Sequence, residues 1–284
     1  TSSSYSISSA DNLSFSDISV SNDTVNATAA YTVDFVVSKA GALSPSFSDK
    51  ISLRFPAEII LPASALGSDV VFTNLTTGFS GSPSILTIDA DSMYFPVPIV
   101  VNNSDEVRVE FSSGLNILNP AIPGSYNLSA STYDGSGGAY IDAETNSNTF
   151  AIVVSTSLVS NIVPTLSSYT NSATNVTYTI PANTGKYGRL VAGTEIDIEF
   201  PATTTFNSTG TTTATVQGVA ATVSILGQVV TVTVPSGVTI NNSSSFTVVI
   251  TKIRNPTANG AYSLIVNTTP EQTGVASSSI NIGA

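Results

Sequence analysis

The chain has 284 residues, 41% of them hydrophobic and 10% charged, and it contains no Cys, His or Trp. Its formal net charge of −11 excludes a nucleic-acid-binding protein of the usual kind, which needs a basic surface for the phosphates. Without His and Cys the chain has neither Ser-His-Asp or Cys-His catalytic groups nor the common zinc ligands, so we expect no enzyme. No apolar run reaches the roughly 18–20 residues of a membrane-spanning helix, so we expect no membrane insertion.

The first predicted element is residues 1–20, which read TSSSYSISSADNLSFSDISV. A start at Thr1 without a charged and apolar leader predicts a mature, secreted protein. The segment alternates polar residues with Tyr5, Ile7, Leu13 and Phe15, which predicts one strand more than a single domain requires. We expect this strand either to complete the open sheet of a neighbouring copy or to pair as an edge strand within its own domain.

Short runs that alternate in period two fill the rest of the chain, separated by Gly, Pro, Asn and Ser. Between residues 21 and 157 they are AAYTVDFVVS, KISLRFP, SDVVFTNLT, EVRVEFSS, YNLSAST and NTFAIVV. Between residues 163 and 284 they are NVTYTI, EIDIEFP, VQGVAATVSI, QVVTVTVP, SFTVVITKI, YSLIVNT and SSSINIG. Gln217-Gly218 and Leu226-Gly227 predict tight hairpin turns. Many short strands at this spacing predict antiparallel β-sandwiches.

An internal repeat divides these strands into two sets. KISLRFPAEI (50–59) matches EIDIEFPATT (195–204), and NPAIPGSYNL (119–128) matches NPTANGAYSL (255–264). More loosely, ATAAYTVDF (27–35) matches ATNVTYTIP (173–181). Three blocks in the same order indicate a duplication. We therefore predict an N-terminal extension over residues 1–20, a first sandwich over 21–157 and a second over 163–284.

The second copy resembles immunoglobulin-like repeats of prokaryotic cell-surface proteins. The resemblance rests on LVAGTEIDIEFP (190–201), VVTVTVP (229–235) and IRNPTANGAYSLIVNT (253–268), and it covers most of residues 165–284. It implies an all-β fold of two tandem immunoglobulin-like antiparallel β-sandwiches with an extra N-terminal strand. Such repeats occur in S-layer-associated proteins. The motif residues are structural, so the resemblance assigns no functional site.

Calcium is the cofactor that the composition allows, because it needs only oxygen ligands. The candidate ligands are Asp89 and Asp91 in IDADSMYF, and Asp134, Asp142 and Glu144 in YDGSGGAYIDAETN. Neither segment has the EF-hand spacing, and acid-rich turns of an acidic protein are usually solvated. A glycosidase-type carboxylate pair lacks a recognisable aromatic cleft around it. We therefore name no certain cofactor.

The repeat also contrasts two strand faces. In the second copy Glu195, Asp197 and Glu199 alternate with apolar residues, whereas the first copy has Lys50 and Arg54 on the equivalent strand. We read both as the solvated side of a strand, with a second use as complementary contacts between domains or subunits. The remaining Tyr and Phe mostly sit at alternating positions, which favours core over a binding platform.

Asn-x-Ser/Thr sequons suggest N-linked glycans, although a chain this rich in Ser and Thr produces several by chance. The candidate acceptors are Asn12, Asn22, Asn26, Asn74, Asn102, Asn127, Asn175, Asn207, Asn241, Asn242 and Asn267.

These observations together predict a secreted, cell-surface structural protein that binds copies of itself. The chain looks like the Ser/Thr-rich subunits of pilus-like extracellular filaments assembled by donor-strand complementation, and it lacks the long apolar N-terminal helix of type IV pilins. A head-to-tail contact of this kind gives an open fibre unless the rotation closes. Two alternatives stay open: an S-layer lattice protein, and an adhesin or carbohydrate-binding module, which would show a concave site with aromatic side chains.

Overall fold

A computed structural model describes residues 11–135, 138–207 and 210–283 of the chain. The chain divides into two compact units. The first contains residues up to Asp23, Ala27–Pro120 and Gly124–Ile152, and the second contains Thr24–Asn26, Ala121–Pro123 and residues from Val153 onward. The second unit thus begins before the boundary near residues 157–163 that the sequence predicts. The reason is that the Ser155 amide bonds to Pro270 and the Ser157 hydroxyl bonds to Glu271.

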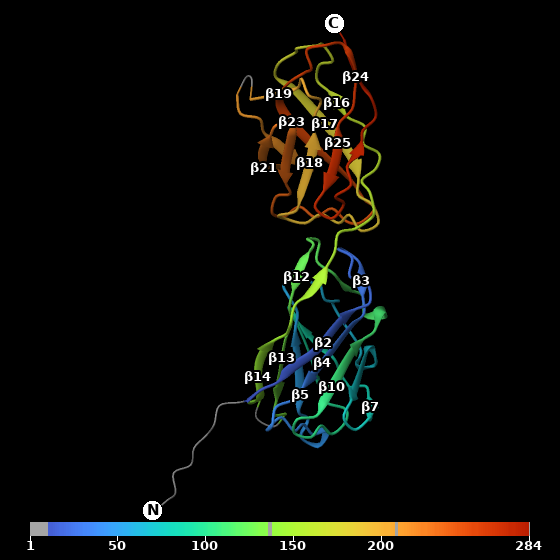
Figure 1. Ribbon diagram of the computed structural model, residues 1–284, viewed down its shortest axis with the longest axis vertical. Helices are drawn as coiled ribbons and strands as arrows, with labels where there is room; N and C mark the ends of the chain where they lie inside the picture. Colours follow the sequence, from blue (N-terminus) through green and yellow to red (C-terminus); the bar gives the residue numbers. More distant parts are fainter. Residues whose placement is uncertain (1–10, 136–137, 208–209, 284) are drawn as a thin grey trace, which may run out of the picture. The chain divides into compact units, whose positions relative to one another are not determined.

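The first unit contains two principal sheets (Figure 1). The six-stranded sheet consists, in spatial order, of β1 (Asp11–Asn12), β14 (Tyr140–Asn146), β13 (Ser129–Tyr133), β5 (Lys50–Arg54), β9 (Ser92–Pro96) and β8 (Thr87–Asp89). The five-stranded sheet consists of β2 (Ser14–Val20), β4 (Tyr31–Val36), β10 (Glu106–Phe111), β6 (Val70–Asn74) and β7 (Ser80–Gly81). Except for β1 against β14, these neighbours run antiparallel.

Shorter elements complete the first unit. They are the pairs β3 (Thr28–Ala29) with β11 (Ile117–Leu118) and β12 (Gly124–Tyr126) with β15 (Phe150–Ile152), and the single-turn 3-10 helices η1 (Pro45–Phe47), η2 (Gly67–Asp69) and η3 (Ser113–Leu115). Among the residues that the structure describes, no helix has the length and apolarity needed to cross a membrane.

The core of the first unit lies between its two sheets. Along β5 the buried residues are Ile51 and Leu53, while Lys50 and Arg54 are exposed, as strand alternation requires. Rings from opposite sheets meet edge-on, for example Phe72 of β6 with Phe95 of β9, whose centroids are 6.3 Å apart. Aromatic pairs in this geometry add to the stabilisation from burial. The predicted all-β, antiparallel sandwich is therefore confirmed.

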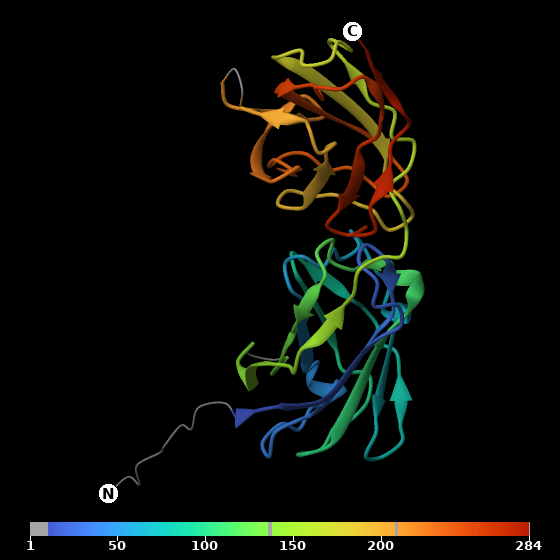
Figure 2. The same cartoon turned by 45° about the horizontal axis from the view of Figure 1, so that its top comes forward.

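The second unit is built from one continuous run of paired strands with a buried core between its faces. In spatial order they are β16 (Thr165–Leu166), β17 (Val176–Asn183), β23 (Ser245–Arg254), β20 (Ala214–Val216), β21 (Val219–Leu226), β22 (Val229–Thr233), β18 (Glu195–Glu199), β25 (Ile265–Thr268) and β26 (Val275–Ala276). β19 (Thr205–Phe206) pairs with β23, and β24 (Gly260–Tyr262) pairs with β27 (Ile280–Ile282). Figure 2 shows the same strands from a second angle.

Two hairpin turns follow the predicted glycines. Gln217 and Gly218 both have positive φ, 52° and 81°, and connect β20 to β21 as a two-residue turn. The second turn is Gly227-Gln228 rather than Leu226-Gly227, because Leu226 still pairs with Val229. In that turn Gly227 has a positive φ of 61° and Gln228 does not, which fits a type II′ turn with Gly at its first central position.

Each unit contains the same Tyr-Phe-Asn cluster. In the first unit the Tyr31 hydroxyl donates to Asn119 Oδ1 at 2.6 Å, and its ring packs edge-on against Phe55. In the second unit the Tyr178 hydroxyl donates to Asn255 Oδ1 at 2.8 Å, and its ring packs edge-on against Phe200. Two of the matched sequence blocks are thus explained by one buried cluster. The loose third block is shifted by one residue, since it aligns Tyr31 with Thr177 and the structure matches Tyr31 with Tyr178.

Candidate functional site

The outer face of the six-stranded sheet is hollowed. Two adjoining hollows of about 360 and 280 Å³ cross strands β8, β9, β5 and β13 and share Ser52, Asp89, Ser92 and Tyr133. The strand register brings these residues together: Ser52 of β5 lies between Tyr94 of β9 and Ser131 of β13. We call this surface the outer groove, and define it by the residues that line the two hollows.

Tyr94 and Tyr133 point outward into the outer groove, although the sequence favoured a core position for most tyrosines. Each is only half-buried. In the run SMYFP the inward positions of β9 are Met93 and Phe95, which are fully buried, so Tyr94 between them must face solvent. The alternation of apolar Met93 and Phe95 around Tyr94 is therefore the sequence signal that places this tyrosine on the outer face. Tyr133 is harder to find, because β13 is buried along nearly its whole length.

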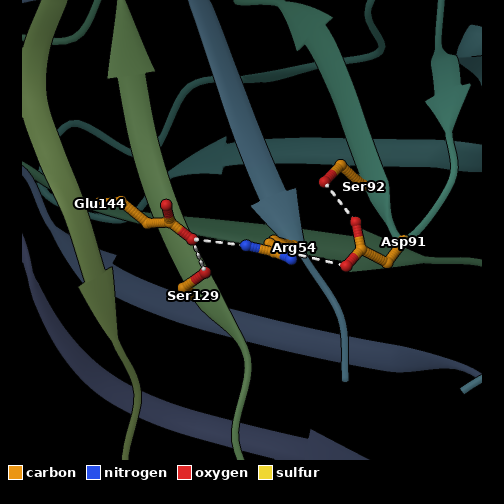
Figure 3. A network of polar contacts seen from close by, with 5 residues as sticks. All are labelled: Arg54, Asp91, Ser92, Ser129 and Glu144. Atoms are coloured by element: carbon orange, nitrogen blue, oxygen red, sulfur yellow. Dashed lines mark hydrogen bonds and ion pairs between the residues drawn. The ribbon is translucent and has the colours of Figure 1, made fainter. Parts of the chain in front are cut away.

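A network of polar contacts occupies one end of the outer groove (Figure 3). Arg54 Nε donates to Asp91 Oδ2 at 2.8 Å, and its Nη1 lies 3.9 Å from Glu144 Oε1. Ser129 donates to Glu144 at 2.6 Å, and Ser92 donates to Asp91 at 3.2 Å. The hydrogen bond from Arg54 lowers the pKa of Asp91, and in turn raises the pKa of Arg54. The network therefore holds an exposed guanidinium in one orientation.

The predicted calcium ligands do not converge. Arg54 lies between Asp91 and Glu144, where a metal ion bound by both carboxylates would have to sit. Asp142 is fully buried on the opposite side of β14, where it accepts hydrogen bonds from the Thr132 hydroxyl and the Ser38 amide. Asp89 and Asp134 line the neighbouring hollow. In the described ranges no three acidic side chains form a group that could hold a metal ion.

Removal of divalent cations is expected to leave the thermal midpoint unchanged within about 1 °C. A structural ion at one hundred times its dissociation constant adds about 2.7 kcal/mol to folding stability, which shifts the midpoint by several degrees. Melting curves recorded with EDTA and with added calcium test this expectation. A lower thermal midpoint in EDTA that added calcium reverses would show that the chain binds calcium.

The contrast between a basic and an acidic strand face is wrong for the first unit. Among the described residues that line the outer groove, Lys50 and Arg54 are accompanied by four acids: Asp89, Asp91, Asp134 and Glu144. These acids come from the β8–β9 turn and from the β13–β14 hairpin, so the segment KISLRFP alone does not reveal them. The outer face of the first unit is therefore of mixed charge, and the use of Lys50 and Arg54 in contacts with the acidic face stays a prediction.

The acid row of the second unit is the solvent side of β18. Glu195 and Glu199 are exposed and Asp197 is half-buried, whereas Ile196 and Ile198 between them are fully buried. Asp197 accepts a hydrogen bond from the Thr231 hydroxyl of β22 at 2.7 Å.

The N-terminal strand pairs within its own unit. β2 runs antiparallel to β4 from Ser14 opposite Val36 to Val20 opposite Tyr31 (Figure 1). Leu13 is buried, and the half-buried Phe15 packs on Phe35 with ring centroids 6.0 Å apart. β2 is the edge of the five-stranded sheet. Tyr5 and Ile7, the other two predicted assembly residues, lie outside the described residues.

Two of the predicted glycan acceptors are wrong for the folded chain, because their amides are buried. Asn26 and Asn74 are at most 1% exposed, and their Nδ2 groups donate hydrogen bonds within the protein. Three others are half-buried: Asn22, Asn242 and Asn267. The exposed candidates are Asn12, Asn102, Asn127, Asn175, Asn207 and Asn241. Whether these carry glycans stays a prediction.

Comparison with known proteins finds no family model and no curated protein that matches the chain. Solved structures match it at low identity. The C-terminal domain of the AgI/II polypeptide BspA from Streptococcus agalactiae is 10% identical, with 96% of this chain and 99% of that chain covered and a TM-score of 0.32. The major pilin subunit BcpA of Bacillus cereus is 9% identical, with 96% and 66% covered and a TM-score of 0.30. The B domain of a biofilm associated protein is 9% identical, with 97% and 87% covered and a TM-score of 0.30. Similarity at this level does not assign the chain to a family.

Proposed function

We propose that the chain is a structural subunit of an extracellular, cell-surface filament in which each copy donates its N-terminal strand to the next. The observation that carries this proposal is the position of β2. It is the edge of its sheet, β4 is its neighbour there, and along it Phe15, Ile18 and Val20 are half-buried while the other side chains are exposed. β1, which precedes it, is likewise an edge strand, paired with β14 of the six-stranded sheet, so the N-terminal segment leaves two sheet edges and no interior position.

Donation takes the form of an exchange, because in the single chain β2 already completes the sheet beside β4. A β2 strand from a second copy makes the same hydrogen bonds and places Leu13 and Phe15 in the same positions. Exchange of an identical element is a low-cost route to association, since each hydrogen bond that β2 breaks within its own chain forms again between chains. A head-to-tail exchange leaves one donor and one acceptor free at the two ends, and therefore propagates as a fibre.

A cysteine pair across β2 and β4 distinguishes exchange from self-pairing. Ser19 and Thr32 are directly opposite each other, and residues opposite each other in antiparallel strands have Cα atoms about 4.5–5.5 Å apart, within disulfide range. Because the chain contains no Cys, every disulfide in the Ser19→Cys, Thr32→Cys variant involves only these two positions, and peptide mapping of the oxidised bands identifies the bonds that join position 19 to position 32. Oxidised fibres of this variant are expected to give a ladder of covalent multimers on a non-reducing gel.

The matched control places the pair across two interior strands. Thr32 of β4 is also opposite Glu110 of β10, and neither strand can be exchanged without opening the sheet. The Thr32→Cys, Glu110→Cys variant is therefore expected to remain a covalent monomer in the same fibres. Fibres that contain only intrachain β2–β4 disulfides would overturn the exchange, and an intact chain that stays monomeric at high concentration would overturn the filament. Two-dimensional sheets in electron micrographs would instead indicate an S-layer lattice.

A further inference from the structure

We propose that the outer groove of the first unit is a binding site for a neutral oligosaccharide. This goes beyond the structural role proposed above, because a filament subunit needs no ligand on the outer face of its six-stranded sheet. The inference rests on the shape of the groove, on the kinds of side chain that line it, and on the different residues at the equivalent positions of the second unit.

The aromatic side chains of the outer groove are placed as platforms. Tyr94 and Tyr133 come from strands on either side of β5, opposite Ser52 and Lys50 respectively. Neighbouring strands lie about 4.8 Å apart, so these two strands are about 10 Å from each other. Both rings are half-exposed above a buried layer of Ile51, Leu53 and their neighbours. A sugar ring presents a face of C–H groups that packs on an aromatic ring in the same way as other apolar faces do.

The polar lining suits hydroxyl groups. Ser52 and Ser92 lie on the floor of the groove and Asp89 at its side. A serine hydroxyl both donates and accepts a hydrogen bond, and a carboxylate accepts, so these side chains match sugar hydroxyls, which also do both. Arg54, fixed by Asp91, adds oriented N–H donors at one end.

The charge of the groove selects a neutral ligand. Two bases and four acids are found among the described residues that line it, so the anionic groups of uronic or sialic acids are disfavoured. The two hollows together fall within the range of small-molecule sites, about 300–1,000 Å³.

The internal repeat supplies a comparison within one molecule. Ser52 of β5 and Asp197 of β18 are equivalent, and the residues paired with them show what changed on the outer face. Tyr94 corresponds to Thr231, and Tyr133 corresponds to Thr269. The inward residues of β5 and β9 in the first copy, and of β18 and β22 in the second, are apolar. Tyr133 packs on the ring of Tyr140 in β14, with centroids 4.7 Å apart, so the two rings form one extended aromatic surface beside the groove. The second unit has threonines at the positions of Tyr94 and Tyr133, so its fold forms without these aromatic side chains.

A carbohydrate fits this face better than a peptide does. Of the strands that the groove crosses, β5, β9 and β13 have hydrogen-bonded neighbours on both sides and cannot accept an added peptide strand. β8 is the edge of the sheet, but it is only three residues long, Thr87–Asp89. The described residues that line the groove also form no deep apolar pocket in which a peptide side chain would anchor.

The test uses the full chain on an array of neutral gluco-, galacto-, manno- and N-acetylglucosamine oligosaccharides, with sialylated glycans on the same array. The best neutral oligosaccharide is then titrated against the protein by NMR. Tyr94→Ala and Tyr133→Ala are each expected to weaken binding by about tenfold or more, the usual effect of losing one stacking platform. Thr231→Ala, at the position of the second unit that corresponds to Tyr94, is expected to bind as the native chain does.

Tyr94→Phe is the control for loss of folding. It keeps the aromatic ring, so it is expected to retain most of the affinity for the oligosaccharide. Thermal melts of all variants check that the sheet is intact. The proposal is overturned if no array glycan binds, if sialylated glycans bind best, or if binding survives both alanine variants. It is also overturned if Tyr94→Ala abolishes fibres although the variant folds and binds no array glycan more weakly than the native chain, since the groove is then a contact between copies.

Discussion

Replacement of Asn119 by alanine is expected to lower the free energy of unfolding of the first unit by about 3 kcal/mol. Asn119 is fully buried, accepts the Tyr31 hydroxyl and donates to the Asn22 carbonyl at 2.7 Å. Burial raises the pKa of Tyr31 far above its ordinary value, so the phenol stays protonated and has to donate. The alanine variant removes both hydrogen bonds, and a buried polar group that loses its partner costs about 1–3 kcal/mol.

The same substitution at Asn255 is expected to act on the second unit. Asn255 accepts the Tyr178 hydroxyl and donates to the carbonyls of Ser168 and Thr170, both at 2.9 Å. Hydrogen exchange followed by mass spectrometry measures the protection of backbone amides in each unit separately. Asn127→Ala, at an exposed position of the first unit, is the control and is expected to change neither. Equal loss of protection in both units from either buried variant would contradict the assignment of one cluster to each unit.

Strand positions and their inward faces could be predicted from the sequence, because they depend on local alternation. Ile51 and Leu53 in the first copy and Ile196 and Ile198 in the second are all fully buried, as their period of two requires. The alignment of the two copies identified the repeated Phe and Asn. It did not reveal that the Asn accepts a buried hydrogen bond from a tyrosine more than 70 residues away.

The buried acids show why the rest could not be predicted. Asp142 accepts the Ser38 amide, and Glu271 accepts the Gly185 amide in the second unit. In each unit the carboxylate accepts a hydrogen bond from the loop that follows the strand of the repeated tyrosine, β4 or β17. However, Asp142 lies in β14, whereas Glu271 lies in the loop after β25, so the two acids do not occupy equivalent positions of the repeat. Alignment of the two copies therefore does not pair them, and Asp142 looked like a metal ligand. A buried polar group takes its partner from the fold, not from its neighbours in sequence.

The outer groove could not be predicted from the sequence either, because the residues that line it are far apart in the chain. Arg54 and Asp91 are 37 residues apart, and Tyr94 and Tyr133 are separated by an interior strand. Each residue taken alone looked like an ordinary outward position of a strand. Only the register of β9, β5 and β13 brings the tyrosines, the serines and the guanidinium onto one surface.

Gly67→Ala is expected to destabilise the first unit by about 3 kcal/mol or more. Gly67 is buried at the start of η2, and a Cβ atom built there would overlap the carbonyl group of Pro83. The segment cannot move aside easily, because the Asp69 side chain accepts the Leu66 amide at 2.8 Å and the Asp69 carbonyl accepts the Ser112 amide. Where there is room for the methyl group, a Gly-to-Ala change stabilises a protein by about 0.4–1 kcal/mol, because it lowers the conformational entropy of the unfolded chain. At Gly67 the overlap with Pro83 outweighs this gain, so we expect net destabilisation.

Gly124→Ala is the matched control in the same unit. A Cβ atom at Gly124 would lie 3.6 Å from the Tyr126 ring, an ordinary contact, and Gly124 is exposed. It is therefore expected to be neutral or slightly stabilising, within about 1 kcal/mol. Urea unfolding monitored by tyrosine fluorescence, which no Trp obscures, gives both values. If the two variants unfold at the same urea concentration, the close approach of Gly67 to Pro83 does not exist in solution. A loss confined to Gly67→Ala would mean that this glycine is required because the two backbone segments touch there.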